Sequence, residues 1–145
     1  MTTRPFTGAK AALLCGDRIL VYLRDDRPGL PWRGLWDLPG GGREGDEGPA
    51  ACLLRELAEE FGLHLPESRL HWQREMASMQ DPAAQSWFFA GWLDADEVAA
   101  IRFGDEGQEW RMMPLKDWLA HPAAVRPLQD RTALALAAGA LTGGP

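Results

Sequence analysis

Three closely spaced glutamates, Glu56, Glu59 and Glu60, are the side chains whose type and spacing most clearly suggest chemistry. On a helix, residues three and four positions apart lie on one face, so the three carboxylates would form an acidic triangle. Like charges at this spacing destabilise a helix by only about 0.2–0.5 kcal/mol per pair. The helical pattern alone therefore leaves open the alternative that these acids form an ordinary solvated face.

The glycines that precede the glutamates favour a metal site instead. Gly40, Gly41 and Gly42 allow the backbone to pass close to a ligand and to direct its carbonyl groups at it. Clustered carboxylates near a backbone carbonyl are hard oxygen ligands, which Mg²⁺ and Mn²⁺ prefer. A bound divalent ion would relieve the repulsion between the acids and would recruit phosphate oxygens. The pattern thus predicts metal-assisted chemistry on an anionic substrate.

The chain that carries these residues has the size of one globular domain, which we expect to span residues 1–145. With 145 residues, 46% of them hydrophobic, it can bury a core without disulfides. Its formal net charge of −6 means that most of its surface would repel a nucleic-acid polymer. A small anionic ligand is compatible with this charge if a metal ion or a local basic cluster mediates the contact.

The cysteines and the N-terminal segment favour a soluble protein in a reducing compartment. Cys15 and Cys52 are far apart and lack a CxxC spacing, which argues against a zinc site or a disulfide framework and predicts that both pack in the interior. The apolar run near the N-terminus is too short and interrupted for a secretory signal, and no window reaches the roughly 18 apolar residues of a membrane span. We therefore expect a cytoplasmic protein without a membrane partner.

The segments that must position the glutamates mix strand and helix patterns, which predicts a layered α/β domain. The glutamates should lie on a helix from about Glu47 to Phe61, because apolar residues recur there at helical spacing and Gly62 can cap its end. Short apolar or aromatic runs predict strands at 9–16, 18–24, 35–39, 69–79, 85–94 and 110–113. Further helical segments are expected at 94–101, at 115–121 and within 126–141, with an exposed loop at 25–34.

The residues around the glutamates match a known signature. From Gly41 to Leu63 the sequence fits Gly-x5-Glu-x7-Arg-Glu-U-x-Glu-Glu-x-Gly-U, where U is a bulky aliphatic residue. The matching positions are Gly41, Glu47, Arg55, Glu56, Leu57, Glu59, Glu60, Gly62 and Leu63. This stretch resembles the complete Nudix box of the Nudix hydrolases, the MutT-related family.

The resemblance implies a fold and a reaction. Nudix hydrolases are α/β/α sandwiches with a mixed β-sheet. They cleave a phosphoanhydride bond in a nucleoside diphosphate linked to another group, with water as nucleophile and Mg²⁺ or Mn²⁺ as cofactor. We therefore expect a pyrophosphohydrolase that acts on a nucleotide or nucleotide conjugate, and a homodimer would be usual for this family. The alternative is a non-catalytic Nudix-fold module with a nucleotide-binding or regulatory role. Such modules commonly lose box glutamates, whereas this chain keeps them.

The resemblance also implies roles for the acidic residues. Glu59 and Glu60 would be the principal metal ligands, Glu56 a further ligand or the general base, and the Gly40 carbonyl a backbone ligand. A carboxylate from a second loop, in the stretch "GDEGQEW", would complete the catalytic and metal-binding set. Glu106 is the candidate there.

Other residues of the box would support these acids. Arg55 would brace the catalytic carboxylates by pairing with Glu47 or Glu56, whereas Gly41, Glu47 and Gly62 would shape the box.

The loop carboxylate has two alternative candidates besides Glu106, namely Glu109 and Asp105. A further position bears on the substrate. MutT-type enzymes that read an oxidised guanine carry an asparagine in a proline-rich stretch, where the nearest positions in this chain are Val125 and Arg126. That difference argues against a role in removing oxidised guanine nucleotides.

Substrate contacts outside the box are expected from basic and aromatic residues. Arg24, Arg27 and Arg33 lie on or just after the second predicted strand and could bind substrate phosphates, although arginines at such places also serve solubility alone. Trp32 and Trp110 lie beside polar loops and could stack on a base or a sugar, with packing in the core as the alternative.

Overall fold

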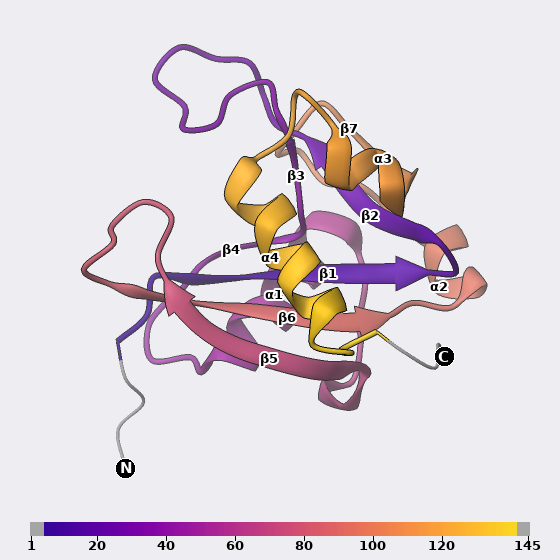
Figure 1. The fold of residues 1–145 in the computed structure, drawn as a ribbon, viewed down its shortest axis with the longest axis horizontal. Helices are drawn as coiled ribbons and strands as arrows, with labels where there is room; N and C mark the ends of the chain where they lie inside the picture. The colour runs from indigo at the N-terminus through magenta and orange to yellow at the C-terminus, as the bar shows by residue number, and fades with distance from the viewer. Residues whose placement is uncertain (1–4, 142–145) are drawn as a thin grey trace.

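The protein forms a mixed seven-stranded sheet with helices on both faces (Figure 1). The structure is a computed structural model, and residues 5–141 are described. The elements follow in the order β1 (Gly8–Cys15), β2 (Arg18–Leu23), β3 (Trp36–Asp37), β4 (Gly40–Gly42), α1 (Pro49–Phe61), a 3₁₀ turn (Glu67–Arg69), β5 (Leu70–Ala77), β6 (Gln85–Trp92), α2 (Ala95–Ala99), β7 (Glu109–Pro114), α3 (Leu115–Ala120) and α4 (Arg126–Ala137).

β1 lies at the centre of the sheet. The main strand order is β3-β2-β1-β6-β5, with β4 paired to β1 and β7 paired to β2. β1 and β6 run parallel, and the other paired strands of the described residues are antiparallel. The hairpin expected between the first two strands is present, with Gly16 and Asp17 at its turn. The sheet is therefore mixed, as the sequence predicts.

The two faces of the sheet carry two separate cores, because side chains of a strand point alternately to opposite faces. On β1, Ala12 and Leu14 belong to one core and Ala11 and Leu13 to the other. In Figure 1, α4 crosses the near face of the sheet and α1 lies behind it. The first core includes residues from α3 and α4, and the second includes residues from α1 (Trp118, Leu128 and Ala135; Leu53, Leu57 and Phe61). The predicted α/β/α sandwich is confirmed.

Helix α1 begins later than the sequence pattern suggests. It starts at Pro49 rather than at Glu47, after Gly48 in an extended conformation. Proline is tolerated in the first turn because the N–H that it lacks would have no partner inside the helix. Glu47 is thus left in the preceding turn, from which its side chain reaches α1. At the other end Gly62 caps the helix as expected, and its N–H donates to the carbonyl of Ala58.

The glycines before α1 form a short strand, which the sequence analysis missed. Gly40, Gly41 and Gly42 make up β4, which pairs with the first residues of β1. At Gly40 the backbone has a φ of 124°, and an added Cβ would lie 2.1 Å from the carbonyl oxygen of Ala9. Only glycine fits this close approach to β1. The glycines therefore hold α1 and the sheet together at one end of the molecule.

The two cysteines differ in how far they are buried. Cys52 is buried, Cys15 is half-buried, and neither forms a disulfide. Both contact the core on the α1 side, so interior packing is confirmed for Cys52, whereas Cys15 packs only at the edge of this core. Within residues 5–141, no helix has the length and apolar character needed to cross a membrane.

Candidate active site

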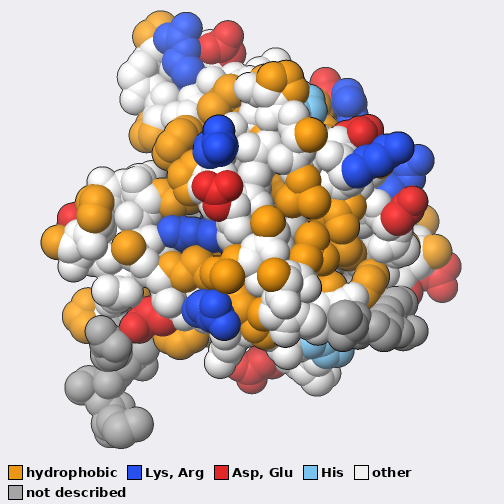
Figure 2. All heavy atoms as spheres, viewed as in Figure 1, with side chains coloured by type: hydrophobic (Ala, Val, Ile, Leu, Met, Phe, Trp, Pro, Cys, Tyr) orange, Lys and Arg blue, Asp and Glu red, His pale blue; other side chains and the backbone are white. Residues whose placement is uncertain are grey.

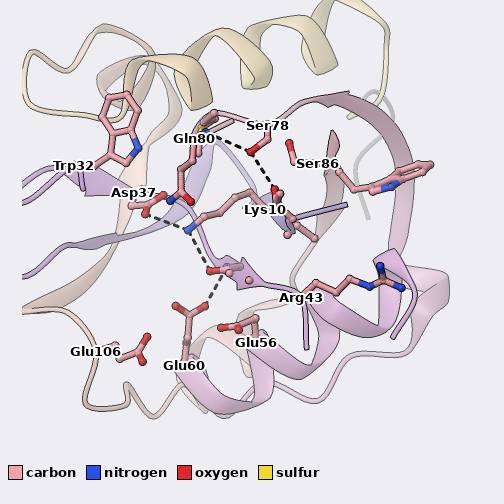
Figure 3. A pocket seen from close by; sticks show the side chains of 18 of the residues that line it. Lys10, Trp32, Asp37, Arg43, Glu56, Glu60, Ser78, Gln80, Ser86 and Glu106 are labelled. Carbon is pink, nitrogen blue, oxygen red and sulfur yellow. Dashed lines mark hydrogen bonds and ion pairs between the residues drawn. The ribbon is translucent and has the colours of Figure 1, made fainter. Parts of the chain in front are cut away.

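A cavity of about 480 Å³ opens beside the glycine strand β4 (Figure 3). Its walls come from the start of β1, from β4 and α1, and from the hairpin that joins β5 to β6. Trp32 from the loop after β2 and Glu106 from the loop before β7 also line it. The cavity is large enough for a nucleotide-sized ligand.

One end of the cavity is acidic. Glu56 and Glu60 of α1 point into it, and Glu106 faces them from the second loop (Figure 3). Glu60 is only 7% exposed and accepts a hydrogen bond of 3.0 Å from the N–H of Gly40. Burial raises the pKa of Glu60 to about 8, although the positive charge of Lys10 opposes this shift. Burial likewise raises the pKa of Glu56; Arg55 opposes this shift, and the charges of Glu59 and Glu106 add to it. A cation at this end would stabilise the ionised acids.

Arg55 holds the acidic end in place from outside the cavity. Its guanidinium donates to Glu47 Oε1 at 2.7 Å, to Glu56 Oε1 at 2.9 Å and to the carbonyl of Gly42 at 2.7 Å. The sequence left Glu47 and Glu56 as alternative partners, and Arg55 bonds both. Since Arg55 does not line the cavity, its geometry is that of a positioning residue.

The resemblance implies that Glu59 is a principal metal ligand, but its side chain lies outside the cavity lining. Its side chain is 56% exposed, bonds Arg55 at 3.2 Å and does not line the cavity. In the described part of the chain, no three His, Cys, Asp or Glu side chains already converge as a metal-binding group. The donor chemistry of Glu56, Glu60 and Glu106 still fits Mg²⁺ or Mn²⁺, because hard carboxylate oxygens surround one polar end of a cavity.

The floor of the cavity is a charged cluster that sequence reasoning missed. Lys10 donates to Asp37 Oδ2 and to the carbonyls of Leu38 and Gly40, each at 3.1 Å. Arg24 and the hydroxyl of Tyr22 donate to the same Asp37 oxygen at 2.9 and 3.0 Å. Burial lowers the pKa of Lys10, but the combined interactions with Asp37, Tyr22 and Glu60 outweigh this and leave the pKa above its ordinary value. The sequence did contain a signal for this cluster, because Lys10 and Asp37 are each the only charged residue in an otherwise apolar predicted strand.

The predicted substrate-binding residues divide between the cavity and other places. Arg24 and Trp32 line the cavity, and Arg27 lines a smaller neighbouring depression together with Glu106. Arg33 instead pairs with Asp26 within the loop, where both side chains are exposed. Trp110 lies on β7, packed against the core on the α1 side and away from the cavity lining.

Of the residues considered by comparison with MutT-type enzymes, some line the cavity and others lie away from it. Glu106 lines the cavity, whereas its rival Glu109 pairs with Arg111 and Asp105 is exposed outside the lining. Val125 is fully buried in the core next to α4.

The arginine that follows, Arg126, is largely exposed, with 83% of its side chain accessible. Neither Val125 nor Arg126 contacts the cavity.

We expect Glu47→Gln to lower the free energy of unfolding by about 1–2 kcal/mol at pH 7, since water partly screens the Arg55 pair. Hydrogen bonding from Arg55 lowers the pKa of Glu47 to about 2. The stabilisation is therefore present above the ordinary carboxyl pKa near 4.5 and is lost as the pH falls towards 2. Urea unfolding at pH 7 and pH 3 should show the difference shrinking by about half or more.

The matched control is Glu44→Gln, because Glu44 is 69% exposed and 3.6 Å from the same guanidinium. It should change stability by less than about 1 kcal/mol at either pH. A Glu47→Gln effect that is equal at both pH values would contradict the assignment.

Comparison with known proteins gives the family and the fold. The NUDIX domain profile matches residues 6–134. An RNA pyrophosphohydrolase of Acidiphilium cryptum (strain JF-5) is 35% identical over 145 residues, covering 88% of this chain and 86% of that protein. The MutT protein from Methanosarcina mazei Go1 has a TM-score of 0.72 at 19% identity, covering 96% of this chain and 99% of that one.

A larger protein contains the same fold. A bifunctional NMN adenylyltransferase/ADP ribose pyrophosphatase from Francisella tularensis, solved with AMP and a Mn ion, gives a TM-score of 0.68 at 20% identity. The match covers 95% of this chain and 43% of that one, so this chain spans less than half of the bifunctional protein. Because the domain profile extends over most of its length and the complete Nudix box places Glu56 and Glu60 at its cavity, this chain belongs to the Nudix family.

Proposed function

We propose that this protein is a divalent-metal-dependent pyrophosphohydrolase. It cleaves a phosphoanhydride bond in a nucleotide, or in a nucleoside diphosphate linked to another group. The observation that carries this proposal is the acidic end of the cavity, where the box residues Glu56 and Glu60 meet Glu106 from a second loop. Membership of the Nudix family supports the reaction class.

Nudix hydrolases use divalent metal ions, and we propose Mg²⁺ or Mn²⁺ for this chain. Glu56, Glu60, Glu106 and the carbonyl of Gly40 would hold the metal. Gly40 already accepts a hydrogen bond from Lys10, but a carbonyl oxygen has a second lone pair. Glu59 could join these ligands if its carboxylate turned away from Arg55. When bound, the metal would polarise the phosphoanhydride and lower the pKa of the attacking water.

The chain's own residues would orient the reactants and move the proton. Glu56 is fixed by Arg55 at the cavity wall, where its carboxylate would accept a proton from water or hold the metal. Lys10 and Arg24 on the cavity floor would attract the negatively charged phosphates. Cytoplasmic location and assembly as a homodimer stay predictions.

The triphosphorylated 5′ end of an RNA is a second candidate substrate. It is favoured by the 35% identity to a relative named RNA pyrophosphohydrolase, of which this chain covers 86%. The charge of −6 argues against extended contacts with an RNA backbone, and basic side chains are scattered on the face shown in Figure 2. An RNA would therefore be bound mainly through its terminal nucleotide.

The decisive experiment is a hydrolysis panel with Mg²⁺, with Mn²⁺ and with a chelator. The substrates are nucleoside triphosphates, sugar nucleotides, dinucleoside polyphosphates and a 5′-triphosphorylated oligonucleotide, with loss of the phosphoanhydride signals and appearance of the products followed by ³¹P NMR. We expect turnover that the chelator abolishes. Tight binding of a nucleotide without turnover of any substrate would instead support the non-catalytic module.

We expect Gly41→Ala to reduce turnover by about 10²-fold, because a small displacement of a catalytic group has an effect of that order. An added Cβ at Gly41 would lie 2.6 Å from the carboxyl carbon of Glu56. Gly42→Ala is the matched control, since the nearest atom there is the carbonyl oxygen of Thr7 at 3.9 Å. Steady-state kinetics with thermal unfolding measures both variants. Equal activity in the two would show that Glu56 needs no fixed position.

A further inference from the structure

The wall of the cavity opposite the carboxylates has a different chemistry. Ser78, Gln80 and Ser86 gather there, with the Lys10–Asp37 pair between them and the acidic end (Figure 3). These side chains are neutral; Ser78 and Gln80 lie in the turn between β5 and β6, and Ser86 lies on β6. Met79 and Trp32 add apolar surface to the same cavity. A flat, uncharged and partly polar group would suit this wall.

One cation lies among these neutral groups. Arg131 of α4 lines the cavity and donates to Ser86 Oγ at 3.1 Å and to the carbonyl of Ala77 at 2.5 Å. Within residues 5–141, no carboxylate lies within 4.0 Å of its guanidinium. Burial alone lowers the pKa of Arg131, which indicates that no neighbouring acid offsets its desolvation.

The guanidinium of Arg131 has donors to spare. An arginine carries five N–H groups in a planar fork, and the two bonds to Ser86 and Ala77 use two of them. The same two bonds fix the plane of the fork at the cavity wall. Tying α4 to the hairpin is one role of Arg131, but that role does not use the remaining donors.

The position of Arg131 favours a base over a phosphate as its partner. If the metal and the phosphates occupy the end with Glu56 and Glu60, the nucleoside extends towards the neutral wall. A cavity of about 480 Å³ has room for both parts of a nucleotide. Arg131 therefore borders the region that a nucleobase would enter.

We propose that Arg131 reads the nucleobase and selects a 6-oxopurine over adenine. The inference rests on the proposed function for the placement of the phosphates. Guanine and hypoxanthine present the O6 and N7 acceptors that match an arginine fork, whereas adenine presents an N6 donor at the same edge. An N–H of Arg131 and the N6 amino group of adenine are both donors, so neither would have a hydrogen-bond partner in this half-buried site. This disfavours adenine.

The test measures binding of GMP, IMP and AMP by calorimetry. These monophosphates lack a phosphoanhydride bond, so the result does not depend on hydrolysis. IMP and AMP isolate the group at position 6. We expect the wild type to bind GMP and IMP about tenfold or more tightly than AMP, the discrimination that one bidentate contact provides. Arg131→Gln should bring the three affinities within about twofold or favour AMP, because glutamine pairs with adenine.

Two further variants control for charge and fold. Arg126→Gln makes the same change at an exposed position of α4 and should leave all three affinities unchanged. Arg131→Lys keeps the charge but loses the fork, so it should also lose discrimination, and it decides the question if Arg131→Gln does not fold.

Equal binding of IMP and AMP by the wild type would overturn the proposal. An equal loss of all three affinities in the folded Arg131 variants would do the same, since that result fits a structural tie. Base discrimination without turnover of any substrate would overturn only the proposed hydrolysis.

Discussion

Replacing Glu60 by glutamine should reduce turnover by about 10³-fold while the fold persists. The metal in such reactions supplies several kcal/mol of transition-state stabilisation, and each 1.36 kcal/mol corresponds to a factor of ten. Glu60 lies almost entirely inside the cavity wall, so a substitute ligand cannot easily replace it. Glutamine has the same shape, and its oxygen can still accept the N–H of Gly40. The variant therefore removes charge rather than packing.

The measurement is kcat at saturating Mg²⁺ or Mn²⁺, with circular dichroism to verify the fold. Glu67→Gln makes the same change in an exposed 3₁₀ turn and should leave kcat unchanged. Glu59→Gln tests the role of principal metal ligand that the Nudix resemblance implies for Glu59. From its exposed position we expect a smaller loss than for Glu60→Gln. Turnover like that of the wild type in Glu60→Gln would remove Glu60 from the metal site.

Replacing Asp37 by asparagine should have the largest effect on stability, a loss of about 3–5 kcal/mol. Asp37 is 2% exposed and is the ion-pair partner of both Lys10 and Arg24. Without its charge, two cations would remain close together at the cavity floor. Such a loss is a large part of the 5–15 kcal/mol that stabilises a typical domain.

Urea unfolding of the metal-free protein measures this loss directly. Asp26→Asn is the matched control, because the Asp26–Arg33 pair lies on an exposed loop with half or more of each side chain accessible. An exposed pair contributes at most about 1 kcal/mol. If Asp37→Asn were no more destabilising than Asp26→Asn, the floor cluster would not stabilise the fold.

Local sequence predicted most of the elements around the site because their signals are local. Apolar residues at helical spacing and a terminal glycine identify α1, and Asp94 with Glu97 forms the capping box that begins α2. The start of α1 was placed too early because Glu47 favours a helix by its own propensity. Glu47 instead lies in the turn before the extended Gly48 and Pro49, where it bonds Arg55 eight residues later.

Strand β4 could not be predicted from its own residues. Three glycines have low strand propensity, and no side-chain alternation marks them. They pair with β1 because the first residues of that strand have a free edge, and because glycine alone permits the close approach at Gly40. Pairing of this kind depends on a partner about 30 residues away, which a local pattern does not contain.

The sequence by itself determined the family, the reaction class and the register of the box acids, because these depend on residue types at fixed spacing along one helix. Tertiary structure alone decided which acids share the cavity, since Glu56 and Glu60 point inward while Glu59 turns to Arg55. It also brings Lys10 into contact with Asp37, 27 positions later in the chain, and Arg131 into contact with Ser86 at the cavity wall. Contacts between distant segments follow from how the sheet and helices pack, and no spacing in the chain encodes them directly.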